Sequence, residues 1–287
     1  MAPSSGMKIR TTASTARGSF NGVGPDDRND DWEDDRAVPV TDAFGRMCRD
    51  YARDELAAPP TYHRDDGETN EAHLGHYFDQ YDEWAELDRV AVDAVEGVDA
   101  ETTHSASVPR TLDLGCGVGR TMLRLQSVGH DVLGVDVSPG AVAVTRERGV
   151  ERAAVMDLFS PATVGPFDAA LVVGQQWCAA GTRNRFRRLL CDLAEVVRPG
   201  GTLVGDVADP TEAPPEHESY MADHRVAPGV VTRRFRLAYD GEFDPWVTLL
   251  MLSIDRFREV VADTPWTVSD VHRDGGRYVA VLRRQPE

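Results

Sequence analysis

Residues 112–120 read LDLGCGVGR, an apolar strand-like run that ends in a glycine-rich turn and opens a helical pattern. Glycines in such a turn let the backbone approach a ligand closely and direct the amides at the helix start toward it. A dinucleotide-binding turn has the spacing G-x-G-x-x-G, and its third glycine packs the helix on the strand. Here the third glycine arrives one residue early, and Arg120 takes the place that it would need. The turn therefore favours a ligand other than a dinucleotide.

Three acids stand where successive predicted strands end: Asp113 in the first, Asp136 in the second and Asp157 in the third. A carboxylate at Asp113 suits a cationic amino group, and Asp136 can accept hydrogen bonds from both hydroxyls of a ribose. Asp157 can accept from an adenine amino group while the amide of Leu158 reads a ring nitrogen. One sulfonium nucleoside, S-adenosylmethionine, would satisfy all three. The alternative for each acid is structural, because acids also end strands and cap helices.

The pattern around the turn alternates between short apolar runs and helical periodicity. Near-continuous apolar strands separated by amphipathic helices predict an α/β domain with a parallel sheet covered on both faces. Further on, a turn at Asp240-Gly241 and another at residues 274–276 predict antiparallel pairs. The predicted strands are 111–114, 131–135, 153–156, 167–173, 202–207, 231–239, 246–252, 266–272 and 278–283, and the predicted helices are 120–127, 141–148, 184–197 and 254–262.

The N-terminal part of the chain divides by composition. Residues 1–40 are predicted to be a disordered acidic tail, because their closely spaced carboxylates repel one another. Residues 41–100 are predicted to be a helical segment, with helices at 41–58 and 72–95 separated by a polar loop at 61–70. A linker at 99–109 leads to the main domain, 108–287, which carries an insertion at 208–250.

On these motifs the chain resembles the class I S-adenosylmethionine-dependent methyltransferases over roughly residues 72–284. Residues 113–119 are similar to that family's first motif, residues 135–136 to its ribose-binding acid and residues 156–157 to its adenine-contacting pair. Residues 167–173 and 198–204 resemble its fourth and fifth strands. The resemblance implies a seven-stranded Rossmann-like sheet in the order 3-2-1-4-5-7-6, with the last strand antiparallel. It also implies an N-terminal helical lid and an inserted loop and strand segment.

The same resemblance implies S-adenosylmethionine as cofactor and transfer of its methyl group to an acceptor. The residues that would bind the cofactor are Asp113, Gly115, Cys116, Gly117, Gly119, Asp136, Val137, Met156, Asp157, Leu158 and Gly174. No catalytic residue and no metal is predicted, because in-line displacement at a sulfonium needs chiefly orientation. Two other functions stay open: a nicotinamide-dependent oxidoreductase, and a binding protein that holds the cofactor without turnover.

The acceptor is not encoded in any motif, and a small molecule is the default. Residues 174–178 depart from the Asn/Asp-Pro-Pro-Tyr pattern that related base methyltransferases use, which disfavours nucleobase methylation. Several residues have both a functional and a structural interpretation. They are Tyr77 and Tyr81 as lid or core, Trp177 as substrate contact or core, His217 and His224 as general base or loop surface, and Arg233, Arg234 and Arg236 as an anion clamp or exposed strand residues.

Composition limits the partners. The chain has 31 basic and 48 acidic residues, a net charge of −17, and all but one of the basic residues are arginine. This resembles proteins of salt-loving archaea, and no basic, aromatic-rich stripe favours a nucleic acid. The cysteines form no C-x-x-C pair, which disfavours zinc and disulfides and fits a reducing cytoplasm. No apolar run is long enough to predict a membrane helix.

Overall fold

The computed structural model describes residues 41–98, 108–161 and 165–286; the predicted tail 1–40 and most of the predicted linker lie outside them. The described residues all belong to one compact unit. The helices are α1 (Ala43–Ala52), α2 (Gly75–Phe78), α3 (Glu86–Glu96), α4 (Arg120–Ser127), α5 (Pro139–Glu147), α6 (Arg183–Val196), α7 (Glu218–Asp223) and α8 (Ile254–Ala262), with 3-10 turns at Tyr81–Glu83, Gln176–Ala180 and Pro215–His217.

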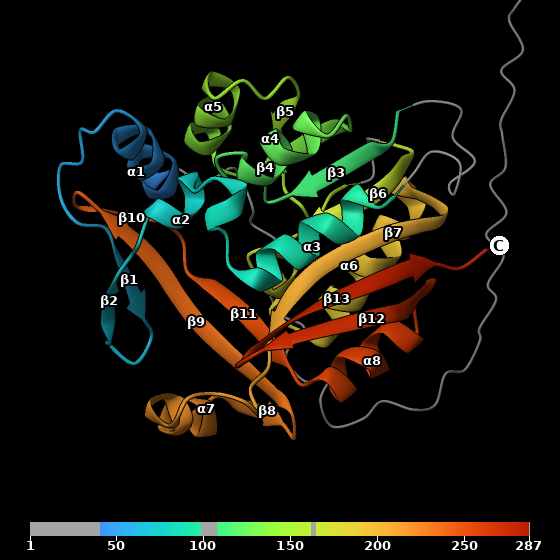
Figure 1. Ribbon diagram of the computed structural model, residues 1–287. Helices are drawn as coiled ribbons and strands as arrows, with labels where there is room; N and C mark the ends of the chain where they lie inside the picture. Colours follow the sequence, from blue (N-terminus) through green and yellow to red (C-terminus); the bar gives the residue numbers. More distant parts are fainter. Residues whose placement is uncertain (1–40, 99–107, 162–164, 287) are drawn as a thin grey trace, which may run out of the picture. The chain divides into compact units, whose positions relative to one another are not determined.

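Thirteen strands among the described residues form two sheets (Figure 1). The strands are β1 (Thr61–Arg64), β2 (Thr69–Glu71), β3 (Arg110–Leu114), β4 (Asp131–Asp136), β5 (Ala153–Val155), β6 (Phe167–Val172), β7 (Val197–Ala208), β8 (Arg225–Ala227), β9 (Val230–Tyr239), β10 (Glu242–Phe243), β11 (Val247–Leu252), β12 (Trp266–Asp274) and β13 (Arg277–Arg284).

The main sheet has the order β12-β13-β7-β6-β3-β4-β5. Strands β3 to β7 pair in parallel, whereas β13 is antiparallel both to β7 and to β12. Numbered by their own sequence and counted from β5, these strands stand in the order 3-2-1-4-5-7-6. The predicted α/β class, strand order and antiparallel last strand are therefore confirmed.

Side-chain alternation along the central strands divides the core between the two faces of this sheet. Ala170 and Val172 pack with α6 and α8, whereas Ala169 and Leu171 pack with α3 and α4. Every residue of β6 is buried. Such a strand has helices on both sides, and for this reason its sequence is apolar at every position except Asp168 instead of alternating.

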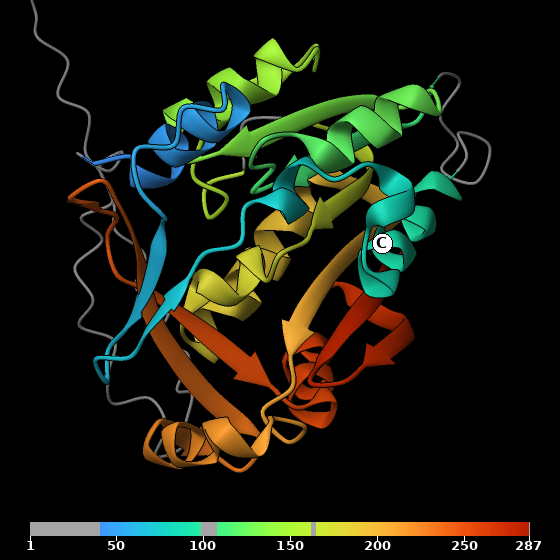
Figure 2. The same ribbon diagram turned by 60° about the vertical axis from the view of Figure 1, so that its left-hand side comes forward.

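The second sheet joins the inserted segment to a hairpin from the N-terminal part. Its central strand, β9, pairs with β1, β8, β10 and β11, and Figure 2 shows the β1–β2 hairpin lying along β9. The prediction of a loop at 61–70 is wrong, since residues 61–64 pair with residues 235–238 of β9. The hairpin is short and polar, so the backbone of a strand distant in sequence supplies its hydrogen bonds.

The predicted single helix at 72–95 is also wrong. It is broken into α2, a 3-10 turn and α3, because Asp79 and Trp84 have extended backbones with ψ of 145° and 149°. The aromatic residues of this segment pack in different apolar clusters. Tyr77 and Phe78 pack with α1 and the second sheet, whereas Trp84 packs with α3 and the main sheet. A straight helix could not bury both groups. The helix predicted at 41–58 forms but ends at Ala52.

Candidate functional site

The glycine-rich turn follows β3 and opens α4. Gly115, Gly117 and Gly119 all have positive φ, at 77°, 54° and 78°. A Cβ on Gly119 would lie 2.7 Å from Thr145, so this buried glycine is needed for packing. A Cβ on Gly117 would meet no atom within 4 Å. Packing against Thr145 therefore fixes the turn at Gly119, whereas at Gly117 there is space for a ligand beside the backbone.

Asp136 connects this turn to the next helix. Its Oδ2 accepts a hydrogen bond from the amide of Gly117 at 2.9 Å, and its Oδ1 accepts from the amide of Ser138 at 2.9 Å. Burial raises the pKa of this carboxyl. The Ser138 hydroxyl caps α5 by accepting from Ala141, which leaves Asp136 to bridge the two loops.

Asp113 lies beneath the turn at the end of β3 and is fully buried. Its Oδ2 accepts a hydrogen bond from the Thr121 hydroxyl on α4, whereas its buried Oδ1 has no hydrogen-bond partner among the described residues. Burial raises the pKa of the carboxyl to about 7. Burying a carboxyl with one oxygen that lacks a hydrogen bond lowers the stability of the folded state, and such a residue calls for an explanation other than stability.

The other predicted cofactor residues follow the ends of β4 and β5. Val137 is exposed, Met156 and Asp157 are half-buried and Leu158 is buried. The Asp157 carboxylate accepts a hydrogen bond from the amide of Phe159 at 2.9 Å. This is a local turn, as expected if Asp157 has only a structural role. Because the carboxyl ends of parallel strands share one edge of the sheet, all of these residues border the same edge as the glycine turn.

The loop after β6 closes this edge on the other side. Gly174 and Gln175 both have positive φ, at 76° and 59°. The amide of Gln175 donates to the buried Asp206 at 2.9 Å, and Oδ2 of Asp206 lies 3.6 Å from Nε of Arg277. Asp206 was missed from the sequence, although it lies near the carboxyl end of β7 and the three predicted acids lie near the ends of their strands.

Gln176 is a second residue that the sequence did not single out. Its Cγ lies 2.5 Å from where a Cβ of Gly115 would be, and its Nε2 lies 3.6 Å from where a Cβ of Gly174 would be. The side chain thus occupies the space between the glycine turn and the loop after β6. Only the tertiary structure brings these two loops together.

Trp177 belongs to the core and not to a substrate site. It is fully buried, its indole N–H donates to the carbonyl of Asp206 at 2.7 Å, and its ring packs against Phe186 and Phe257. A Cβ on Gly205 would lie 2.6 Å from the ring. The substrate-contact interpretation of Trp177 is therefore wrong.

Helix α1 is fastened to the start of α5. The Asp42 carboxylate caps α1 by accepting from Gly45, and it also accepts from the Ser138 hydroxyl at 2.6 Å and the Gly140 amide at 2.7 Å. One acid therefore joins the first turn of two helices, each of which has unsatisfied amides there.

Helix α2 is fastened to the glycine-rich turn. Arg148 donates to the carbonyl of Val118 at 2.8 Å and to that of Tyr77 at 3.4 Å. The Tyr77 hydroxyl lies 3.2 Å from the Tyr62 hydroxyl of β1. Tyr81 lies elsewhere, since it donates to Asp93 and contacts Trp84. Of the two tyrosines, only Tyr77 lies where α2 meets the turn.

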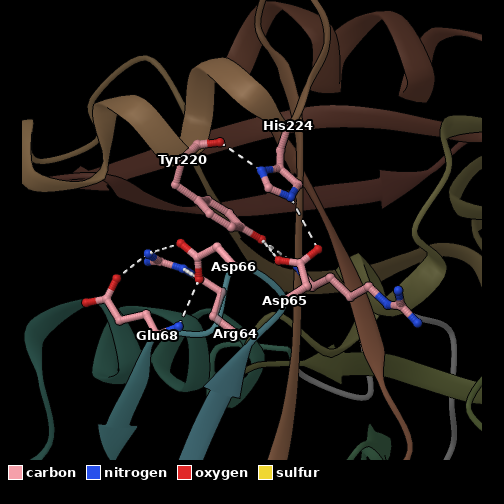
Figure 3. A network of polar contacts seen from close by, with 7 residues as sticks. Arg64, Asp65, Asp66, Glu68, Tyr220 and His224 are labelled. Atoms are coloured by element: carbon pink, nitrogen blue, oxygen red, sulfur yellow. Dashed lines mark hydrogen bonds and ion pairs between the residues drawn. The ribbon is translucent and has the colours of Figure 1, made fainter.

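His224 belongs to a network that joins α7 to the β1–β2 turn (Figure 3). Its Nε2 lies 3.2 Å from Asp65 and its Nδ1 lies 2.9 Å from the carbonyl of Tyr220. The Tyr220 hydroxyl donates to the same Asp65 at 2.8 Å, and the Arg64 guanidinium lies 4.2 Å from the Tyr220 ring. Both ring nitrogens of His224 are thus engaged in holding two elements together, which favours its structural interpretation. His217 lies in the 3-10 turn before α7.

Strand alternation separates the three arginines of β9. Arg234 and Arg236 share one face, where both stack on Trp246, and Arg233 lies on the other face. They therefore do not form a single clamp.

The cysteines and acids give no sign of a metal centre. Cys48, Cys116 and Cys178 are buried thiols, and burial raises the pKa of Cys116 far above its usual range. No three His, Cys, Asp or Glu side chains gather to hold a metal in the parts of the chain that are described. None of the helices in those parts has the length and apolarity to span a bilayer.

Comparison with known proteins places this architecture. Residues 112–205 match the family described as the methyltransferase domain. The crystal structure of a SAM-dependent methyltransferase from Bacteroides fragilis, in complex with S-adenosyl-L-homocysteine, aligns with 85% of this chain and 95% of that one, at a TM-score of 0.69 and 20% identity. The fold is that of the S-adenosylmethionine-dependent methyltransferases. Within this methyltransferase fold, the insertion and the β1–β2 hairpin together build the second sheet.

Curated relatives match over shorter stretches. Hemagglutinin 1 of Eikenella corrodens is 34% identical over 128 residues, which are 39% of this chain and 42% of that protein. A demethylmenaquinone methyltransferase of Tropheryma whipplei is 34% identical over 99 residues, which are 32% of this chain and 39% of that protein. The match thus spans about two fifths of these relatives. The methyltransferase fold is the feature that the solved structure and this chain share.

Proposed function

We propose that this protein is an S-adenosylmethionine-dependent methyltransferase that acts on a small-molecule acceptor. The observation that carries the proposal is the position of the Asp136 carboxylate, at the edge where the acids and the glycine turn meet. It accepts a hydrogen bond from the amide of Gly117 at 2.9 Å. The methyltransferase match over residues 112–205 and the strand order of the sheet support it.

The residues at this edge fit such a cofactor. Gly117 faces open space, so a ligand can approach its backbone. Asp136 would hold the ribose hydroxyls, with Asp157 and Leu158 near the base. Burial raises the pKa of the Asp113 carboxyl to about 7, and a cationic amino group beside it would stabilise its charged form. When bound, the cofactor supplies an activated methyl group.

The chain's own contribution would be orientation and exclusion of water. The loop at Gly174 and Gln175 is fixed by Asp206, and the Gln176 side chain spans from it to Gly115. Helix α2 is tied to the turn through Arg148. Fixed positions for both reactants can contribute roughly 7 to 11 kcal/mol to lowering the barrier, without any acid–base residue.

Three features of the chain favour a small acceptor over a nucleobase in a polymer. The loop after β6 reads Gly174-Gln175-Gln176, unlike the pattern of base methyltransferases. Val118 of the turn packs in one apolar cluster with residues of α1, α2 and the second sheet. The net charge of −17 opposes association with nucleic acid at low salt.

Equilibrium dialysis with radiolabelled S-adenosylmethionine tests the cofactor directly. We expect saturable one-site binding that S-adenosyl-L-homocysteine displaces and that NAD does not. Binding of NAD instead would establish the oxidoreductase alternative. If the cofactor binds, incubation with labelled methyl donor and a small-molecule cell extract should yield labelled product, and its absence would favour a binding protein without turnover.

A further inference from the structure

One face of the second sheet faces the segment that covers the glycine turn. On β9, Arg233, Phe235 and Leu237 alternate onto this face, and Tyr62 of β1 lies opposite Leu237. The Tyr62 and Phe235 rings pack edge to face with centroids 5.5 Å apart. Together with Leu249, which pairs with Arg233, these side chains form what we call the inner face.

The inner face leads to the candidate cofactor edge. The Tyr62 hydroxyl lies 3.2 Å from that of Tyr77, and Tyr77 is tied through Arg148 to Val118 in the glycine turn. Leu237 and Val118 belong to the same apolar cluster. A molecule lying on the inner face would therefore extend from Arg233 past Tyr62 toward the turn.

Arg233 stands out on this face by its lack of a counter-charge. In a chain with 48 acidic residues, it makes no ion pair with any acid in the described ranges, and its guanidinium lies 5.6 Å from the centroid of the Phe235 ring. Arg64 on the adjacent strand is paired instead with both Asp66 and Glu68.

The surroundings of Arg233 favour an anion. Its side chain is accessible to solvent, yet the protein around it and the positive charge of Arg64 lower the pKa of its guanidinium. The guanidinium is thus open to solvent and has no acidic partner among the described residues, so an anion can reach it. A guanidinium binds carboxylate or phosphate with charge-assisted hydrogen bonds, and the tyrosine and phenylalanine rings beside it offer an apolar wall.

We propose that Arg233 binds an anionic group of the methyl acceptor, a carboxylate or a phosphate, with the acceptor lying along Phe235 and Tyr62 and its reacting atom beside Tyr77. This rests on the proposed function and adds a substrate class to it. Arg234 provides a matched control, because it is the next residue of the same strand, lacks an acid partner among the described residues and points to the opposite face.

The test titrates inorganic phosphate, and separately acetate, into protein loaded with S-adenosyl-L-homocysteine, at constant ionic strength, by calorimetry. We expect the wild type and Arg234→Gln to bind one of the two anions alike, and Arg233→Gln to bind it about tenfold or more weakly, in line with loss of a hydrogen bond to a charged group. Phosphate or acetate as the better ligand identifies which anionic group the acceptor carries.

Three results would overturn this inference: no binding of either anion, equal binding by Arg233→Gln, or an equal loss in Arg234→Gln. Loading with S-adenosyl-L-homocysteine is measured first and separately. If the complex with S-adenosyl-L-homocysteine forms but neither anion binds to it, only the proposed substrate class is wrong. If no complex forms, the proposed function itself fails. A labelled product from cell extract should also bind an anion-exchange resin.

Discussion

Asp136 shows how one side chain can shape the proposed cofactor site before any ligand binds. Its two oxygens accept hydrogen bonds from the amides of Gly117 and Ser138, so the glycine turn and the start of α5 are fixed relative to each other. A ribose at this edge would find the acceptor atoms already in place, which reduces the entropy lost on binding.

We expect Asp136→Ala to lower affinity for S-adenosylmethionine by about tenfold or more, because hydrogen bonds to a charged group contribute about 1.5 to 3 kcal/mol. Equilibrium dialysis gives the dissociation constant. Asp131→Asn, at the other end of the same strand, is the control, since Asp131 pairs with Arg110 and Arg152 near the surface. Equal affinities of Asp136→Ala and the wild type would exclude the ribose role.

Asp113 makes the stability of the protein depend on pH. Its folded pKa of about 7 lies above the reference value of 3.8, so the folded state holds a proton there that the unfolded state releases. The free energy of unfolding therefore falls as pH rises between these two values, and the loss is complete above pH 7.

Asp113→Asn removes this contribution, so its stability relative to the wild type should be greater at pH 8 than at pH 5. Urea unfolding at both pH values measures the difference, with Asp263→Asn at an exposed position as the control. Parallel pH profiles for Asp113→Asn and the wild type would show that the carboxyl is not held protonated.

At the scale of elements, the contact between α1 and α5 decides how the N-terminal segment is placed. The helices approach closely at Gly45 and Gly140, where a Cβ on Gly140 would lie 2.7 Å from the Gly45 backbone. Asp42 joins the same helix starts by hydrogen bonds. Backbone atoms cannot yield as a flexible side chain does, so the spacing of these helices depends on glycine here.

Gly140→Ala should therefore lower the free energy of unfolding by roughly 1 to 3 kcal/mol, the usual cost of overpacking. It should also speed proteolysis within residues 53–60, which follow α1. Gly97→Ala serves as control, since its Cβ would meet the nearest atom at an ordinary 3.5 Å. Unchanged stability and proteolysis would mean that α1 and α5 can separate at little cost.

The elements also show where local sequence is a poor guide. The apolar residues of 72–95 do recur at helical spacing, yet the helix is broken. Trp84 has an extended backbone and donates its indole N–H to the carbonyl of Asp79. By contrast, β3, α4 and α6 form within one or two residues of their predicted positions. Each of those elements packs on one core only, β3 and α6 on one face of the main sheet and α4 on the other, so its own periodicity and its tertiary contacts agree.

At the scale of the whole molecule, the excess of acids is the dominant charge feature. A net charge of −17 makes the compact state repel itself, and many ion pairs among the described residues lie at or near the surface. Salt screens such repulsion, since the Debye length falls from about 10 Å at 0.1 M to about 3 Å at 1 M.

We expect the urea midpoint of unfolding to rise as potassium chloride is raised from about 0.1 M to about 1 M, because screening of the repulsion outweighs the weakening of exposed ion pairs. Unfolding followed by circular dichroism at a series of salt concentrations measures this. A midpoint that falls with salt would contradict the salt-adapted character predicted from composition.

The resemblance of the sequence motifs to a known family implied the strand order, which the structure has. From its own pattern, the amino-acid sequence predicted the parallel sheet and a common edge for Asp113, Asp136 and Asp157. This was possible because buried strands and amphipathic helices have distinct periodicities, and because parallel strands end along a common edge. The roles of those acids toward a cofactor stay predictions. Only the tertiary structure decided that residues 61–71 join the insertion in a second sheet, that Trp177 is core and that Arg233 is separated from Arg234. These features depend on pairing between segments far apart in the chain, and short polar strands carry no local pattern that specifies such pairing.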